Sequence, residues 1–316
     1  NRVGVQTLIR RVMDTYSGAF MIIHYDNDVK WDWRFTFCQL KEKNEYTDSK
    51  RYTFLLGPNQ SCRTAAENFK KLADLNQVIS IKDIQAAFDV EALSKEFFRK
   101  YKWHYERFVE YITGKSFVKE AGKFVEKTTS EPHPEYYAAF GNDDKAVRDY
   151  VKLTLGRIIL CHFIQKKGWL GVSKDSPWGT GDEQFIRNLY LNANETQKSD
   201  FLESVLEPLF FDGFNTDRRS GGDLFECTVI GTVRIPYLNG GLFEQGRADG
   251  IKVSFPKDYF DDLLKFFSEY NFTIDENDPN EAQVGIDPEM LSQIFENLLE
   301  DNKDKGAFYT PKEIVQ

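Results

Sequence analysis

The chain has 316 residues, of which 41% are hydrophobic and 29% are charged, and its formal net charge is −9. This composition is typical of a globular protein and excludes a chain that is disordered throughout. The longest apolar run, Ile158–Ile164, is too short to cross a bilayer. Residues 1–126 hold 21 Lys and Arg against 17 Asp and Glu, so this part could meet phosphate groups, although ordinary scatter of charge between two domains explains the same numbers.

The cysteine pattern and the first residues bear on the compartment. The four cysteines lie far apart without a CxxC pair, which argues against a disulfide framework or a zinc site and favours the reducing cytoplasm. Cys161 lies in an apolar run and is predicted to be a small core residue. No secretion leader opens the sequence, and no membrane partner is expected. The first residue is Asn1 rather than methionine, which suggests that the chain begins inside a longer protein.

Residues 1–88 are predicted to form a small mixed α/β domain. Apolar residues at helical spacing near the amino terminus predict a first helix, and two apolar runs of strand character follow, from Gly18 and from Trp33. The second run alternates, as in a strand with one buried face, and that face carries Trp33, Phe35 and Phe37. A third strand over 51–57 and a helix from Thr64 complete this domain.

Residues 89–305 are predicted to form a mainly α-helical connector domain, so the expected fold class is α+β. A first long helix is capped by Asp89, is ended by Gly114 and buries one stripe of its surface, made of Leu93, Phe97, Tyr101, His104, Phe108 and Ile112. His104, like His162 further on, is expected to be an ordinary core or surface histidine. Residues 119–141 contain two prolines and are predicted to be a loop or an embellishment.

A second long helix is predicted from Asp143 to Lys167, and Gly168 is a natural residue to end it. Its apolar residues cover nearly every side, so we expect it to lie at the centre of the core. Loops rich in Gly, Asp and Ser are predicted over 171–183 and 212–223. Further helices are predicted near residues 182–192, 198–208 and 257–270, with a last amphipathic helix from Asp287.

The segment GAFYTPKE, residues 306–313, combines small residues, two aromatic residues and a helix start. Thr310 can cap the helix, Pro311 can be its first residue, and Glu313 can complete a capping box. The free N–H groups and the positive dipole end of such a start can hold a carboxylate or phosphate group. A well-capped helix start without any ligand explains the same residues.

The string KGAFYTPKEIV at 305–315 resembles motif X of gamma-class N6-adenine DNA methyltransferases, which opens their catalytic domain. The resemblance implies that residues 306–316 begin a methyltransferase domain. It also implies that one wall of the pocket for the methionine end of S-adenosylmethionine is formed by Phe308, Tyr309, Thr310 and Pro311. The preceding residues 284–306 look like the helix that leads into this motif in large type IIG restriction–modification enzymes. Other stretches that resemble the region upstream of the methylase in such enzymes are 51–69, 155–171 and 235–244.

This resemblance implies an amino-terminal fragment of a DNA adenine-N6 methyltransferase from a restriction–modification system. The parent protein would transfer a methyl group from S-adenosylmethionine to the exocyclic amine of adenine in double-stranded DNA. Such an enzyme also needs a glycine-rich loop beside the cofactor and an Asn-Pro-Pro-Tyr-like motif that grips the flipped adenine. Neither occurs in this sequence, so the fragment is not expected to methylate DNA by itself.

A metal-dependent nuclease is one alternative. Restriction nucleases of this kind bind Mg²⁺ through an acidic residue on one strand and a Glu-x-Lys or Gln-x-Lys on the next. Asp26 or Asp28 follows the first predicted strand, and Gln39 and Lys41 close the second. A solvated hairpin turn explains the two acidic residues equally well, and no metal ligands are assigned.

A non-catalytic DNA-contacting spacer module is the other alternative, since it needs only shape and a basic strip that faces phosphate. Arg218 and Arg219 lie in a predicted mobile loop that could touch the DNA backbone. Trp31, Trp33 and Arg34 could stack on bases, although a strand with a buried aromatic face explains them better.

Overall fold

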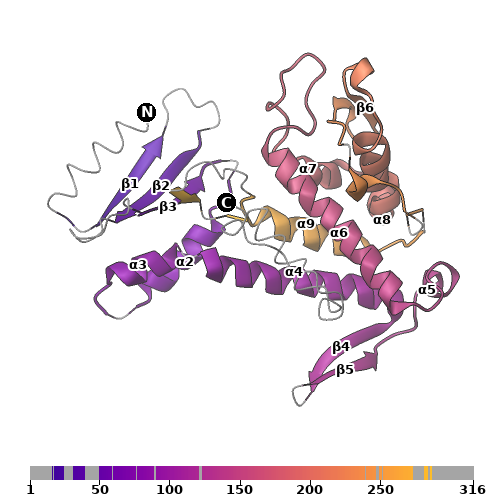
Figure 1. The fold of residues 1–316 in the computed structure, drawn as a ribbon, viewed down its shortest axis with the longest axis horizontal. Coiled ribbons are helices and arrows are strands. Elements are labelled where there is room, and N and C mark those ends of the chain that lie inside the picture. Colours follow the sequence, from indigo (N-terminus) through magenta and orange to yellow (C-terminus); the bar gives the residue numbers. More distant parts are fainter. Residues whose placement is uncertain are drawn as a thin grey trace. The chain divides into compact units, whose positions relative to one another are not determined.

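The structure is a computed structural model of the chain, and its described residues form two compact units (Figure 1). The first unit contains the described residues up to Phe97 together with those from Glu269 onward, and the second unit is Phe98–Ser268. The residues described are 16, 18–24, 31–39, 50–58, 60–75, 77–88, 90–120, 123–238, 240–246, 249–250, 252–272, 281–283 and 285–286. The helices predicted near the amino terminus and from Asp287 lie outside these ranges.

A four-stranded sheet lies in the first unit, in the order β1-β2-β3-β8. Its strands are β1 (Gly18–His24), β2 (Trp33–Gln39), β3 (Lys50–Leu56) and β8 (Glu281–Gln283). The first three strands pair antiparallel, as the sequence predicts, whereas β8 pairs parallel with β3. Residues separated by more than 200 positions therefore form one sheet.

Aromatic side chains join this sheet to the helices α2 (Arg63–Ala73) and α3 (Ile81–Ala87). The ring of Phe35 lies 5.4 Å from that of Phe69 on α2, and the ring of Phe54 lies 4.8 Å from that of Phe88, which ends α3. Burial of these rings supplies the main stabilisation of this unit.

The prediction that β2 buries only one face is wrong in the middle of the strand. Thr36 and Cys38, on the face opposite Phe37, are as buried as Phe37 itself. Thr36 lies directly across from Thr53, and their hydroxyl oxygens are 3.0 Å apart in a shared hydrogen bond. Because the two hydroxyl groups satisfy each other, the polar face can be buried as well.

The two long predicted helices are confirmed as α4 (Val90–Thr113) and α6 (Asp144–Lys166). Asp143 caps α6 by accepting hydrogen bonds from the backbone N–H groups of Lys145 and Ala146. Gly114 and Gly168 follow the two helices with φ values of 68° and 66°, a backbone conformation that favours glycine. The whole predicted stripe of α4 is buried, and the stretch of α6 from Thr154 to Ile159 is buried on every side.

The predicted helices near 182–192 and 257–270 are confirmed as α7 (Phe185–Asn192) and α9 (Lys257–Ser268). The one predicted near 198–208 is longer and less regular. It consists of α8 (Glu195–Ser199) and two π-helical segments, η1 (Leu202–Leu206) and η2 (Leu209–Phe214). Two short 3₁₀ turns follow, η3 (Arg219–Gly221) and η4 (Gly241–Phe243). Among the described residues, no helix has both the length and the apolar character that a membrane span requires.

The segment 119–141, predicted to be a loop or an embellishment, is not a loop throughout, because part of it forms a β-hairpin. The strands β4 (Lys115–Glu120) and β5 (Lys123–Thr128) pair antiparallel, and α5 (Pro134–Ala138) follows. Two residues separate the strands in the sequence, a connection length that favours a tight hairpin. The prolines lie beyond the second strand, so they do not interrupt it. A second, unpredicted hairpin joins β6 (Leu224–Cys227) to β7 (Gly231–Arg234).

Candidate functional site

Of the residues predicted to bind the cofactor or to form a nuclease site, the structure describes Gln39. Phe308, Tyr309, Thr310 and Pro311 lie outside the described residues, as do Asp28 and Lys41. Gln39 is the last residue of β2, where its side-chain oxygen accepts a hydrogen bond from the Gln85 amide of α3. Within the described ranges, no group of three or more His, Cys, Asp or Glu side chains is arranged to hold a metal ion.

Two of the stretches that resemble the upstream region of type IIG enzymes meet at Arg157. This residue lies on α6, within the stretch 155–171, and its side chain is 2% exposed. Its Nε donates to the Leu242 carbonyl at 2.7 Å, and its Nη2 donates to the Glu244 carbonyl at 2.8 Å. Both carbonyl groups belong to the stretch 235–244. Arg157 therefore fixes the turn around η4 against the central helix.

The guanidinium of Arg157 is also paired with a buried carboxylate. Asp249, likewise 2% exposed, accepts from Nη1 at 2.6 Å and from Nη2 at 3.0 Å. The ring of Phe211 lies 5.1 Å from the guanidinium carbon, on the irregular helix 195–214. This bidentate, charge-assisted geometry orients the cation firmly. Because Arg157 is buried and its donors are engaged, it positions neighbouring segments and cannot reach a phosphate group.

Glu207 lies beside this buried pair, between η1 and η2. Burial, together with the negative charges of Asp249 and Glu203, raises the pKa of Glu207 to about 7. The pKa of Glu203 is also raised, mainly by burial. The carboxyl group of Glu207 therefore gains and loses its proton near neutral pH.

Glu207→Gln tests this assignment through the pH dependence of stability. The pKa of Glu207 in the folded chain, about 7, is above its ordinary value of 4.5, so the folded chain binds the proton more tightly than the unfolded chain. The stability that this proton contributes is fully present below about pH 4.5 and is lost as the pH rises through 7. Near pH 8 we therefore expect Glu207→Gln to be more stable than wild type by about 1–2 kcal/mol, after allowance for solvent screening.

Denaturant unfolding at a series of pH values measures this difference. We expect it to shrink towards zero below about pH 4.5, where the wild-type carboxyl becomes protonated in both states. Glu244→Gln is the matched control, because Glu244 is exposed and the same substitution there leaves the buried cluster intact. Equal stability of wild type and Glu207→Gln at pH 8 would show that the ionised Glu207 carboxylate does not lower the free energy of unfolding.

The third resembling stretch, 51–69, contains the turn between β3 and α2, and this turn is hydrogen-bonded to Asn271, which follows α9. The side chain of Asn271 donates to the carbonyl groups of Leu55 and Ser61 at 3.1 and 3.2 Å, and it accepts from the Ser61 N–H at 2.9 Å. Gln60, in the same turn, donates to the Asp32 carboxylate at 2.8 Å. The stretch therefore anchors the returning chain to the sheet.

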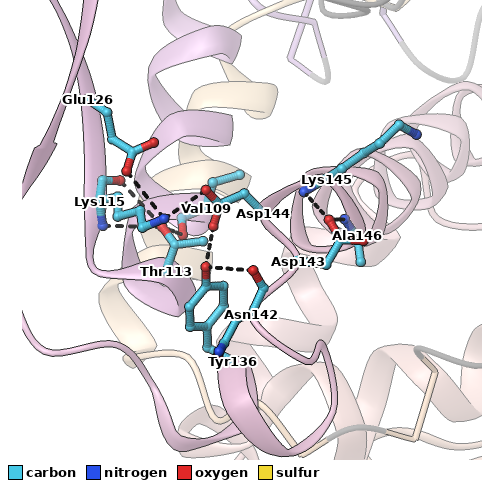
Figure 2. A network of polar contacts seen from close by, with 10 residues as sticks. All are labelled: Val109, Thr113, Lys115, Glu126, Tyr136, Asn142, Asp143, Asp144, Lys145 and Ala146. Carbon is cyan, nitrogen blue, oxygen red and sulfur yellow. Dashed lines mark hydrogen bonds and ion pairs between the residues drawn. The ribbon is translucent and has the colours of Figure 1, made fainter.

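A polar network joins the β4–β5 hairpin to the start of α6 (Figure 2). Lys115 Nζ lies 2.9 Å from Asp144 and 3.3 Å from Glu126, and the Tyr136 hydroxyl donates to Asp144 and to the Asn142 carbonyl. The hydrogen bond to Asp144 raises the pKa of Lys115. Partial burial acts to raise the pKa of Asp144, but the hydrogen bonds from Lys115 and Tyr136 outweigh it and lower this pKa. The positive charge of Lys115 is neutralised within the network, whose role is to hold the hairpin.

Arg218, one of two arginines that could touch a DNA backbone, is engaged by the chain itself. Its guanidinium donates to the carbonyl groups of five residues, at positions 212, 213, 216, 224 and 235. Arg219 instead pairs with Asp217 at 2.6 Å. Trp33 and Arg34 are half-buried on opposite faces of β2, whereas Trp31 is exposed, so the three side chains do not share one surface.

Three residues of the second unit, which we call the helical unit, are core residues, as predicted: His104, His162 and Cys161. Burial lowers the pKa of His162 to about 3 and that of His104 to about 4, so both are neutral at physiological pH. The Nδ1 atom of His162 lies 3.0 Å from the Gln165 amide. Cys161 is fully buried, and burial raises the pKa of its thiol. None of these groups is exposed to a substrate.

Comparisons with models of protein families, with curated proteins and with solved structures find no match to this chain.

Proposed function

We propose that this chain is the region that precedes and opens the methylase domain of a DNA adenine-N6 methyltransferase, in a cytoplasmic restriction–modification system. The methyl donor is S-adenosylmethionine, and the acceptor is adenine in double-stranded DNA. The observation that carries the proposal is the segment GAFYTP at 306–311, with its likeness to motif X. Phe308, Tyr309, Thr310 and Pro311 are then one wall of the pocket for the methionine end of the cofactor.

The contacts of the described residues support this proposal indirectly. Stretches 155–171 and 235–244 meet through Arg157, and stretch 51–69 is bound to Asn271. Each resembling stretch therefore makes contacts within its own unit, which suits a structural connector. In this role Arg157 is a positioning residue. The glycine-rich loop and the Asn-Pro-Pro-Tyr motif that methyl transfer needs are not in this sequence.

Substitution of Thr310 in the parent protein tests the cofactor wall. Thr310→Ala removes the cap that orders the helix start, so we expect S-adenosylmethionine to bind more weakly by roughly 1 kcal/mol, or about fivefold in Kd. Thr310→Ser keeps the capping hydroxyl and is expected to bind like wild type. Equal affinity of Thr310→Ala and wild type would mean that residues 306–313 form an ordinary helix start.

A further inference from the structure

The loop between α6 and α7, residues 168–183, is built as a fixed structure on the surface of the helical unit (Figure 1). The Gly168 carbonyl accepts hydrogen bonds from the N–H groups of Gly179 and Gly181, at 3.1 and 2.8 Å. A Cβ atom on Gly168 would collide with the Gly179 backbone. The Val172 carbonyl accepts from the Arg234 N–H at 2.7 Å, which ties the loop to β7. The loop therefore presents its side chains in a defined arrangement.

Two tryptophans of this loop remain in contact with water. Trp169 is 42% exposed and Trp178 is 37% exposed. Gly168 and Gly179 are in backbone contact, and each is next to one of the tryptophans in the chain, so the backbone of Trp169 lies close to that of Trp178. Large aromatic side chains that a rigid loop holds at the surface are typical of a binding surface rather than of solvent-facing loops.

A cation without an acidic partner lies on one of these rings. The Arg234 guanidinium carbon is 4.1 Å from the centroid of the Trp178 ring. Its Nη1 donates to the Ser176 carbonyl at 2.8 Å, and its Nε donates to the Gly222 carbonyl at 3.1 Å. Among the described residues, no carboxylate forms an ion pair with Arg234. The positive charge is therefore held on the ring but is not neutralised.

The other exposed Trp–Arg pair of this unit differs in this respect. Trp103 is 54% exposed, and Arg107 lies 5.4 Å from its ring, but Arg107 is paired with both Asp258 and Asp262. That pair joins α4 to α9 and carries no net positive charge. Unlike the charge of Arg107, the positive charge of Arg234 beside the α6–α7 loop is therefore available to a ligand.

Two lysines add to the charge of the loop surface. Lys167 and Lys174 are exposed, and within the described part of the chain neither forms an ion pair. The carboxylates of the loop are Asp175, Asp182 and Glu183, and Glu183 is paired with Lys166. Lys167, Lys174 and Arg234 outnumber the other two, so a small excess of positive charge remains. We call Lys167, Trp169, Lys174, Trp178 and Arg234 the loop surface.

We propose that the loop surface binds the sugar–phosphate backbone of DNA. Lysine and arginine side chains attract phosphate groups and release their counterions, and a tryptophan face packs on a deoxyribose or on an unpaired base. Arg234 is already oriented by Trp178 and Ser176, so it loses little conformational freedom on binding. The choice of DNA as the polymer rests on the proposed function, whereas the position and chemistry of the surface rest on the loop itself.

Fluorescence anisotropy with the 316-residue chain tests the charges of this surface. At about 50 mM salt we expect Lys174→Glu to weaken binding of a short duplex by roughly tenfold and to make the salt dependence less steep. Lys145→Glu is the matched control: it is the same change at the other end of α6, about 30 Å away by the rise of the helix, and we expect less than about a twofold effect. Equal effects of the two substitutions, or none from either, would overturn the proposal.

A second pair of variants tests the aromatic contact separately. We expect Trp178→Ala to weaken DNA binding by at least about fivefold, and Trp103→Ala, which removes the Trp of the neutralised pair, to leave it unchanged. Tighter binding of single strands than of duplex would place Trp178 on an unpaired base, and equal binding would place it on deoxyribose. If Trp178→Ala binds DNA like wild type, Trp178 does not contact DNA and the proposed aromatic contact is wrong.

The result is distinguishable from a failure of the proposed function. S-adenosylmethionine binding by the parent protein depends on its methylase residues, so Lys174→Glu is expected to leave it unchanged. A parent protein that binds DNA through the loop surface but binds no S-adenosylmethionine would refute the methylase assignment alone. Unchanged DNA binding by the loop variants would refute this inference alone.

Discussion

Arg157→Met is expected to lower the free energy of unfolding by about 3–5 kcal/mol, because it leaves Asp249 buried without its cation. The substitution also removes the donors to the Leu242 and Glu244 carbonyl groups, which hold the η4 turn against α6. Both charged side chains are 2% exposed, so water cannot replace the lost interactions without rearrangement of the core. Denaturant unfolding measures the change.

The double variant Arg157→Met with Asp249→Leu separates the charge from the packing. A buried ion pair replaced by apolar residues of similar volume is often nearly neutral, so we expect the double variant to recover much of the loss. Arg187→Met is the matched control, because Arg187 pairs with the partly exposed Asp261 and its loss is expected to cost less than about 1 kcal/mol. If Arg157→Met and Arg187→Met cost the same, the Arg157 cluster does not hold this unit together.

Ile159→Asp is expected to cost more than about 4 kcal/mol and to leave the helical unit unfolded at room temperature. Ile159 is fully buried on α6, and its neighbours Ile158 and Leu155 are fully buried as well. The new carboxylate would have no cation within the core of α6, since Arg157 is already engaged by Asp249. Circular dichroism during thermal unfolding checks the result. A melting temperature close to that of wild type would show that α6 is not the central helix of this unit.

Ile159→Val is the control for this variant. It keeps the residue apolar and β-branched and removes one methylene group, so we expect a loss of about 0.5–1.5 kcal/mol. Lys145→Asp, on the exposed start of the same helix, is expected to be nearly neutral.

Elements whose signals are local in the chain could be predicted from the sequence. The stripe of α4 follows from helical spacing, and the ends of α6 follow from Asp143 and Gly168, because caps act within one turn. The β4–β5 hairpin was missed because the apolar residues of its strands are adjacent, as in Phe117–Val118, rather than alternating. Pro132 and Pro134, which lie just after it, also made the whole segment look irregular. The burial of Thr36 depends on its partner Thr53, which periodicity along one strand does not reveal.

Contacts between distant residues could not be predicted. Arg157 and Asp249 are 92 positions apart, and no local pattern joins them. A lone arginine within an apolar helix does signal a buried partner, but it does not say which carboxylate that is. In the same way, β8 is three residues long, and its parallel pairing with β3 depends on the fold of the whole unit. The predicted cofactor residues depend on the motif at 306–311 alone.

Titration calorimetry with S-adenosylmethionine tests the central claim most directly. Most of a cofactor pocket lies in the methylase domain, so the 316-residue chain by itself is expected to give no heat of binding. The parent protein, which adds this domain, is expected to bind the cofactor, and more weakly once Thr310 is replaced by alanine. Tight binding to the 316-residue chain alone, or a parent protein that binds no S-adenosylmethionine, would contradict the account.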